Sequence, residues 1–554
     1  MEVFIKNGIS RKITIEDQTV KSLEDLSRYV FGEDYKNYLG VRINNRVYNL
    51  ERAVEDGMEI EYIDIKNVDG YRIFTRTITA IFIKACNELY PDRPVTIEQF
   101  LGTGLYTCFE NGEAMNFRDI EKIKKRMQKI IDEDHRISRK RYTREEAIEF
   151  FESVGNTNKV RLLKTLTRDK IDIYKVCSYI DTYHGYLAPS TGYIRAFDLK
   201  YYYPGLLILF PNPDTPDQIA EFVEQKKLAK VFDESKRWAE ILDLQYVGSL
   251  NEKVINGSIG EVIRVSEALH NKKLGLIADQ ICQEMDVRMV LIAGPSSSGK
   301  TTFANRLSTH LKVNGRNPIT ISVDDYFVNR VDTPLNEDGS YDFEAVEAID
   351  LKQLNADLIA LLEGDEVELP KYNFLTGERE KSGKLIRIGK EDQIILEGIH
   401  CLNPRLTCEI PDKNKFKIYI SALTQLNIDA NNRIATTDTR LIRRLVRDYK
   451  YRGNDPSRTF ELWSGVRRGE EKHIFPFQEE ADVMFDSALV YELSMLKKYA
   501  VPLLREISED NHYYSEARKL IKFLDYFKGI EDESPIPPNS IIREFIGGAD
   551  FNVH

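Results

Sequence analysis

Short apolar runs of strand length, separated by turn residues, fill the first 65 positions of the chain. Residues 3–5 and 12–15 are predicted to form one hairpin around Asn7-Gly8, and residues 40–44 and 46–49 a second around Asn44-Asn45. Helical spacing of apolar residues falls between the hairpins at 23–29, and a further strand is expected at 59–65. The pattern predicts a small β-rich module over residues 1–65.

The spacing of apolar positions changes again after residue 205. A proline-rich turn at 211–216 is followed by helical spacing at 221–232 and 266–285, which predicts a helical bridge over residues 206–285. From 286 to 505 apolar strands alternate with helices, an order typical of a mostly parallel α/β sheet. Residues 506–554 are expected to form a C-terminal helix and a tail that is extended, or docks on a surface, beyond Gly529.

Composition narrows the class of protein. Of the 554 residues 42% are hydrophobic, the six cysteines show no C-x-x-C spacing, and the formal net charge is −11. The length suggests several domains, and free thiols are the default state of the cysteines. The acidic net charge argues against broad nonspecific binding of nucleic acid. The sequence has no run of eighteen apolar residues and no signal-peptide pattern, so we expect a cytoplasmic protein without a membrane partner.

Eight residues of the 286–505 region have the pattern G-x-x-x-x-G-K-[ST]. They follow the apolar run 289–293 and precede helical spacing at 303–311. Backbone N–H groups of such a loop cradle nucleotide phosphates, its lysine reaches the β and γ phosphates, and the next hydroxyl holds Mg²⁺. We therefore expect Lys300 to act in catalysis, Thr301 to bind Mg²⁺, and ATP to be bound by Gly294, Ser296, Ser297, Ser298, Gly299, Lys300, Thr301 and Thr302.

Two acidic residues follow predicted strands of the same sheet. Asp324 comes after the strand 318–323, and Glu397 ends the strand that begins at 394. Because parallel sheets bind ligands at the carboxyl ends of their strands, Asp324 is expected to accept the proton of a substrate hydroxyl or to hold Mg²⁺. The plain alternatives are a helix cap for Asp324 and a solvated strand-end acid for Glu397.

Four arginines share one face of a predicted helix. Arg440, Arg443, Arg444 and Arg447 stand at i, i+3, i+4 and i+7, while leucine and valine at 441, 445 and 446 mark the opposite face. A solvated charged face is the ordinary explanation of such a run, and a phosphate-binding face is the alternative.

Four ordered blocks resemble the uridine kinase and phosphoribulokinase family of P-loop kinases. They are residues 341–350, 370–379, 394–399 and 438–448. The resemblance implies a P-loop NTPase parallel sheet with helices on both faces, and Glu397 as a Mg²⁺ ligand, directly or through water. It also implies a lid helix over ATP, in which Arg440 and Arg443 contact the nucleotide and Arg444 and Arg447 neutralise charge on the transferred phosphoryl group.

The same resemblance outlines an acceptor pocket. Glu344 matches the family's carboxylate that hydrogen-bonds ribose hydroxyls, where the family has aspartate. Tyr372 and Phe374 line the pocket in the family, and aromatic rings suit stacking on a planar base, although core packing is the alternative for Phe374. Asp324 and Arg444 complete the residues expected to contact the substrate.

The pyrimidine-binding pattern of uridine kinases is broken at two positions. Gly377 stands where the family has a histidine, and Asn454 where it has an arginine, so the identity of the base is open. Trp463 lies in the segment 458–470, which is unlike ordinary uridine kinases, and it either stacks on a ligand or packs in the core.

The front half resembles parts of a different family. Residues 1–65 resemble the TGS β-grasp domain, and residues 69–205 resemble the second, editing domain of threonyl-tRNA synthetase, including a capping box at Thr143 and Glu146. The metal-type histidines and cysteine of that editing site are replaced here by Arg76, Ala80, Tyr183 and Leu187. We therefore expect a retained α+β fold without hydrolytic editing, and a packing or surface role for the nearby His184.

These features predict an ATP- and Mg²⁺-dependent kinase that converts a nucleoside, either uridine- or cytidine-like or a purine, to its 5′-monophosphate. One alternative is a phosphoribulokinase-like sugar-phosphate kinase, with Arg467, Arg468 and Lys472 binding the acceptor's phosphate. A second is an RNA-associated or nucleotide-sensing regulatory protein whose front half binds tRNA. Members of the resembling family are often multimers, so a homo-oligomer stays open.

Overall fold

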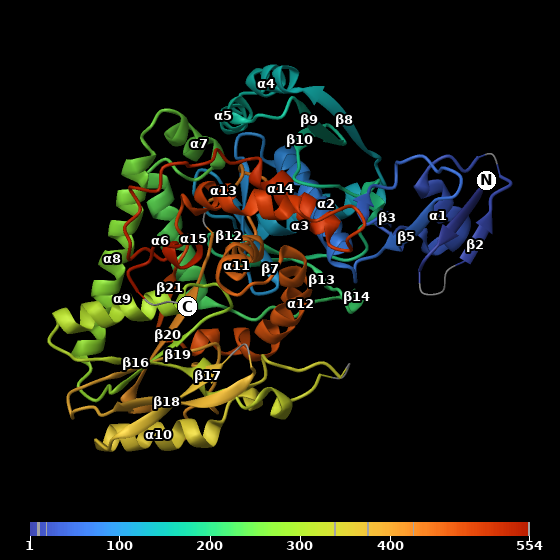
Figure 1. The fold of residues 1–554 in the computed structure, drawn as a ribbon. Coiled ribbons are helices and arrows are strands. Elements are labelled where there is room, and N and C mark those ends of the chain that lie inside the picture. Colours follow the sequence, from blue (N-terminus) through green and yellow to red (C-terminus); the bar gives the residue numbers. More distant parts are fainter. Residues whose placement is uncertain (8–10, 18, 337–338, 374–375, 425, 552–554) are drawn as a thin grey trace.

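The computed structural model describes residues 1–551 except 8–10, 18, 337–338, 374–375 and 425. Figure 1 shows the N-terminal module at one side of the molecule, the 69–205 region next to it, and the C-terminal residues returning to the middle. Within the described part of the chain, no helix combines the length and apolar character that crossing a bilayer requires.

The N-terminal module is a five-stranded sheet with one helix. Its strands lie in the order β2 (Arg11–Thr14), β1 (Glu2–Ile5), β5 (Glu59–Ile63), β3 (Gly40–Ile43) and β4 (Arg46–Tyr48), and the helix is α1 (Leu23–Phe31). Asn44 and Asn45 have φ values of 48° and 55°, a left-handed turn that asparagine tolerates and that joins β3 to antiparallel β4. The second hairpin, the short helix and the antiparallel pairing of β1 with β2 are confirmed, whereas the turn expected at Asn7-Gly8 falls partly outside the described residues.

The 69–205 region contains two antiparallel sheets and a pair of packed helices. The helices are α2 (Val68–Leu89) and α3 (Phe117–Asp132). One sheet has the order β11 (Asp198–Tyr202), β12 (Gly205–Leu209), β7 (Gly104–Phe109) and β6 (Val95–Leu101), and the other β10 (Tyr179–Thr182), β9 (Lys170–Val176) and β8 (Ile137–Thr143). The Thr143 hydroxyl accepts the Glu146 N–H at the start of α4 (Arg144–Ser153), which confirms the capping box, and α5 (Thr157–Thr165) follows.

The predicted helical bridge begins later than expected. Strand β12 continues the sheet of the preceding region to Leu209, and the proline-rich turn is a small hairpin of β13 (Pro211–Asn212) and β14 (Thr215–Ile219). The helix expected from Glu221 starts at Lys226 instead. The three helices here are α6 (Lys226–Ile241), α7 (Val247–Ile255) and α8 (Ile259–Gln283), and α8 packs against the first helix of the next region.

A five-stranded parallel sheet forms the core of the 286–505 region, as predicted. Its order is β16 (Ile319–Ser322), β19 (Ile394–Glu397), β15 (Met289–Ala293), β20 (Lys415–Ser421) and β21 (Val483–Asp486). Val290 and Ile292 pack into a core shared with α9 (Lys300–Val313), whereas Leu291 packs on the other face into a core shared with α10 (Leu351–Glu363). Because both faces of β15 are buried, the strand is apolar at every position.

A hairpin and a group of helices complete this part of the described chain. β17 (Val367–Asn373) and β18 (Glu378–Ile386) form a separate hairpin. The helices are α11 (Thr436–Tyr451), α12 (Pro456–His473), α13 (Glu492–Arg505), α14 (Tyr514–Leu524) and the short α15 (Arg543–Ile546). α11 packs against α12, α13 and α15, so it lies inside the molecule (Figure 1).

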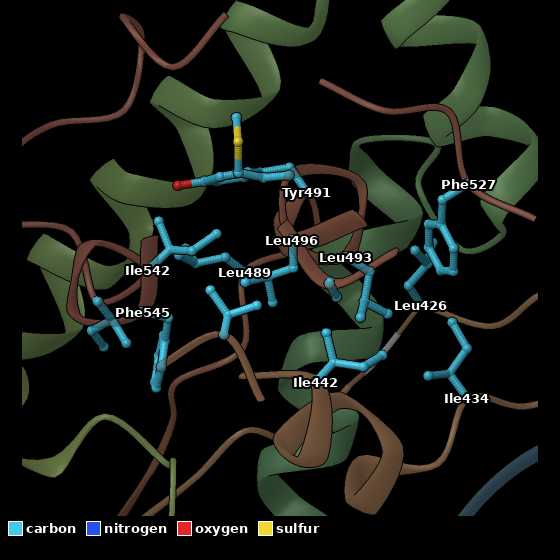
Figure 2. Packing of buried hydrophobic residues seen from close by; sticks show 14 of the residues in the cluster. Leu426, Ile434, Ile442, Leu489, Tyr491, Leu493, Leu496, Phe527, Ile542 and Phe545 are labelled. Atoms are coloured by element: carbon cyan, nitrogen blue, oxygen red, sulfur yellow. The ribbon is translucent and has the colours of Figure 1, made fainter. Parts of the chain in front are cut away.

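The C-terminal tail is part of the hydrophobic core. Ile541, Ile542 and Phe545 have no exposed side-chain surface. Figure 2 shows Ile542 and Phe545 in the same cluster as Ile442 of α11 and Leu489. Of the two arrangements expected for the tail, docking on a surface is therefore the one found for this part, because its apolar side chains are buried in the cluster that includes residues of α11 and α13.

Asp486, at the end of β21, gives folding stability a pH dependence. Its Oδ1 accepts the N–H groups of Leu423 and Ala488, each at 2.9 Å, and burial raises its pKa from 3.8 to about 6. Since the folded protein holds this proton more tightly than the unfolded chain, the contribution of Asp486 to stability falls as pH rises across about pH 4–6.

Asp486→Asn keeps the accepting oxygen and removes the charge. We expect it to raise the free energy of unfolding at about pH 7 by roughly 1–3 kcal/mol, with little change at about pH 4.5. Urea unfolding at the two pH values measures the effect. Asp217→Asn, at an exposed position, is the control. The expectation is contradicted if the stability of the Asp486 variant changes with pH as much as that of the native chain does.

Candidate active site

The phosphate loop connects β15 to the N-terminus of α9. Gly299 precedes the helix with a φ of 87°, and Ser297 has a φ of 61°. A Cβ at Gly294 would lie 2.1 Å from the carbonyl oxygen of Ile420, so no side chain fits at that position. The two glycines thus allow a tight turn that points the first amides of α9 into the space at the carboxyl end of β15.

Two hydroxyls of this loop are buried without a partner. Ser297 and Ser298 are 3% and 0% exposed, and neither Oγ has a hydrogen-bond partner within the described structure. A buried hydroxyl that makes no hydrogen bond costs free energy, and an anion that accepts hydrogen bonds from it removes this cost. The donors therefore fit the phosphates of a nucleotide such as ATP.

Two of the predicted Mg²⁺ ligands, Thr301 and Glu397, come together beside the loop. The Thr301 hydroxyl lies 3.4 Å from Glu397 Oε1, which also accepts a hydrogen bond of 3.0 Å from Ser322 Oγ. Burial raises the pKa of Glu397 to about 7, Lys300 opposes the shift, and Asp324 adds to it. A hydroxyl and a nearby carboxylate are hard oxygen ligands that suit Mg²⁺, so Thr301 and Glu397 fit the ion.

The arginine helix is buried instead of solvated. Arg440, Arg443, Arg444 and Arg447 are all less than 9% exposed. Arg440 donates to the Ser296 carbonyl at 3.0 Å and pairs with Glu470, and Arg443 donates to the Ser297 carbonyl at 3.3 Å and pairs with Glu492. These two arginines therefore support the phosphate loop through its carbonyl groups, and in this conformation α11 is a packed helix, not an open lid.

Three further guanidinium groups gather around one carboxylate. Arg444 and Arg447 contact Asp448 at 3.1 and 2.7 Å, and Arg452 lies 3.8 Å from it. Arg447 is the main cause that lowers the pKa of Arg452 to about 10, while Asp324 opposes this shift. Arg444 also donates to Ser296 Oγ at 2.8 Å. The cluster carries more positive than negative charge next to the phosphate loop, which favours an anionic ligand.

Glu344 interacts electrostatically with Arg444 of α11 and with Lys300 of the phosphate loop. Burial raises its pKa to about 7, Arg444 and Lys300 oppose this, and Glu470 and Asp324 add to it. A Cβ at Gly469 of α12 would lie 2.3 Å from Glu344 Cβ, so the small residue makes room for the acid. The structure thus brings Lys300, Asp324, Glu344, Glu397 and Arg444 into one electrostatically coupled group.

The aromatic residues of the predicted acceptor pocket have different positions. Tyr372 is buried at 7% exposure, and its ring packs 5.5 Å from that of Phe327. Phe374 lies outside the described residues. The Trp463 ring lies 5.4 Å from the Arg440 guanidinium and packs against the core.

Gly377 has a φ of 76°, and a Cβ there would lie 2.7 Å from Arg330 Nε, so its turn excludes a larger side chain.

Several residues of the site were not predicted from sequence. Glu470 and Glu492 neutralise the loop-supporting arginines, and Glu544 contacts Thr302 from the C-terminal helix. The partners of Arg440, Arg443 and Thr302 are 30 to 242 residues away, and no local pattern marks them.

Three of the four positions that match the metal-type ligands of the editing family lie in an apolar cluster. Ala80, Tyr183 and Leu187 pack together with Ile137 and Val176. Arg76 donates to the Tyr186 carbonyl, and a Cβ at Gly185 would lie 2.6 Å from its guanidinium. His184 is packed near Phe523 and Tyr526, and burial lowers its pKa well below the usual value. This environment stabilises a neutral imidazole and offers no ligand set for zinc.

Comparison with known proteins divides the chain in two. The N-terminal region is similar to threonine–tRNA ligases. That of Wolbachia pipientis subsp. Culex pipiens (strain wPip) is 31% identical over 162 residues, 29% of this chain and 26% of that protein. That of Ehrlichia chaffeensis (strain ATCC CRL-10679 / Arkansas) is 31% identical over 176 residues, 32% of this chain and 28% of that protein. The chain thus covers little more than a quarter of these relatives' length.

The C-terminal part matches a kinase family. A solved structure titled as a possible uridine kinase from Bacillus stearothermophilus is 21% identical, with a TM-score of 0.25, and the match covers 36% of this chain and 89% of that one. The family model described as "Phosphoribulokinase / Uridine kinase family" matches residues 289–494, which contain the phosphate loop, Asp324, Glu397 and the arginine helix. Residues 289–494 therefore match the phosphoribulokinase and uridine kinase family model, and they follow an N-terminal region similar to threonine–tRNA ligases.

Proposed function

We propose that the chain is an ATP- and Mg²⁺-dependent kinase that phosphorylates the 5′-hydroxyl of a nucleoside. The observation that carries the proposal is the convergence of Lys300, Asp324, Glu344 and Glu397 beside a phosphate loop with two unpartnered hydroxyls. A nucleotide switch needs the loop and a Mg²⁺ ligand, but the additional acids and the arginine cluster suit transfer to a hydroxyl.

Each residue of the group has a task in this proposal. Lys300 and the loop amides hold the phosphates, and Thr301 and Glu397 hold Mg²⁺, which offsets phosphate charge when bound. Asp324 accepts the proton of the attacking hydroxyl while the new oxygen–phosphorus bond forms and ADP leaves. Glu344 binds the hydroxyls of the acceptor sugar, and Arg444 and Arg447 stabilise the charge on the transferred group.

The sugar-phosphate alternative has less support. It needs free cations for the phosphate that the acceptor already carries. Arg467 instead pairs with Glu470 at 2.9 Å and with Glu471 at 3.0 Å, and its guanidinium lies over the Phe475 ring. One of the three cations on which the rival relies is therefore already neutralised, and the proposal gives the acceptor pocket to an uncharged sugar.

A screen with radiolabelled ATP tests the proposed function. Uridine, cytidine, adenosine and guanosine are compared with ribulose 5-phosphate, and the products are separated by charge. We expect one nucleoside class to gain a single phosphate in a Mg²⁺-dependent reaction. Transfer to the phosphosugar alone would support the rival. If no acceptor is labelled although ATP binds, the nucleoside kinase proposal is wrong.

A further inference from the structure

The C-terminal segment 540–547 lies against the phosphate loop, although nearly 240 residues separate the two in sequence. Glu544 Oε2 accepts hydrogen bonds from the Thr302 hydroxyl at 2.7 Å and from the Thr302 N–H at 3.3 Å. Glu544 is 6% exposed. A carboxylate therefore lies at the N-terminus of α9, where the helix dipole and the first amides favour negative charge.

The two donors that Glu544 engages belong to the phosphate-binding part of the loop. Thr302 is the third residue of α9, so its N–H has no partner within the helix. In a P-loop these amides cradle the α and β phosphates. A nucleotide phosphate and the Glu544 carboxylate thus compete for the same donors, and two anions in one buried position repel each other.

The segment is fixed to the elements that carry the site. Ile541 lies over Gly299, where an added Cβ would come within 2.6 Å of its Cγ2. The Phe545 ring lies 5.0 Å from the Arg443 guanidinium, and Lys450 donates to the Ile546 carbonyl at 2.5 Å. In Figure 2, Ile542 and Phe545 lie within the buried cluster that includes Ile442 and Leu489. The contact with Thr302 is therefore made by an ordered segment.

We propose that residues 540–547 are an autoinhibitory segment, in which the Glu544 carboxylate occupies a phosphate position of the nucleotide site and leaves it when ATP or ADP binds. The proposal rests on the proposed nucleotide binding at this loop. Nucleotide binding then depends on the position of the C-terminal tail. Bound nucleotide weakens the binding of the segment to the loop by some factor, and an event that holds the segment away increases nucleotide affinity by that same factor.

Glu544→Gln tests the competition. The amide keeps the size of the side chain and removes its charge, so we expect the dissociation constant for Mg²⁺–ADP, measured by calorimetry on the full chain, to fall by about tenfold, within the usual range of coupling between sites. Glu531→Gln makes the same charge change at an exposed position of the tail and should leave the dissociation constant unchanged. An unchanged or higher dissociation constant in the Glu544 variant would overturn the proposal.

Tryptic cleavage of the native chain gives a second measurement that does not depend on the variant. The Arg543 side chain is 14% exposed and donates to the carbonyl groups of Glu533 and Ile536, so cleavage after it requires the segment to open. We expect Mg²⁺–ADP to accelerate this cleavage. If the native chain binds ADP but Arg543 stays protected, the autoinhibitory contact is wrong and the kinase proposal stands. If the folded native chain binds no ADP, both are wrong.

Discussion

Asp324→Asn is expected to lower turnover by about 10²- to 10⁴-fold, the usual effect of losing a general base. The amide keeps the shape of the side chain but cannot accept the proton of the attacking hydroxyl. Asp324 follows the carboxyl end of β16, and its charge contributes to the pKa shifts of Glu344, Glu397 and Arg452. The affinity for ATP should change little, since the loop amides and Lys300 are intact. Steady-state kinetics measures turnover, and a separate titration with ADP measures the nucleotide affinity of the loop.

The neighbouring acid provides a matched control. Asp325 accepts the Tyr372 N–H at 3.4 Å, and burial raises its pKa. Asp325→Asn changes the same charge one residue away and should cost less than tenfold in turnover, because an amide oxygen can still accept that bond. Equal losses in the two variants would indicate a general structural effect, and near-normal turnover of Asp324→Asn would refute its role as the base.

The parts of the site that sequence predicts are those whose determinants are local. The phosphate loop is recognisable because two glycines, a lysine and a threonine have fixed spacing between a strand and a helix. Glu397 is recognisable because it ends a short apolar strand. The parallel sheet follows from the alternation of strands and helices, whereas the helical bridge starts at Lys226, later than the pattern predicts.

The buried state of the arginine helix could not be predicted in the same way. A run of arginines at helical spacing is usually solvated, and what allows these to be buried is pairing with Glu470, Glu492 and Asp448. Two of these acids come from other helices, so the pairing depends on tertiary packing. The same holds for Glu544, whose contact with Thr302 spans 242 residues.

Lys159→Met is expected to destabilise the folded chain by about 3–5 kcal/mol, the usual cost of removing one partner from a buried ion pair. Lys159 Nζ lies 2.8 Å from Asp181 Oδ1 and 2.7 Å from Asp429 Oδ2, and all three side chains are at most 3% exposed. Asp181 belongs to the synthetase-like region and Asp429 to the kinase region. Without the ammonium, two carboxylates would remain buried with like charge, and at least one would have to take up a proton.

Chemical unfolding of the full chain measures this loss, with Lys164→Met on the same helix as the control. Lys164 is 58% exposed and pairs with Glu152 at the surface, so its loss should cost less than about 1 kcal/mol. The triple change Lys159→Met, Asp181→Asn and Asp429→Asn removes all three charges and should recover most of the stability, since a buried polar group without charge is less costly. A triple variant no more stable than Lys159→Met would show that packing of the lysine chain, and not the charge left behind, accounts for the loss.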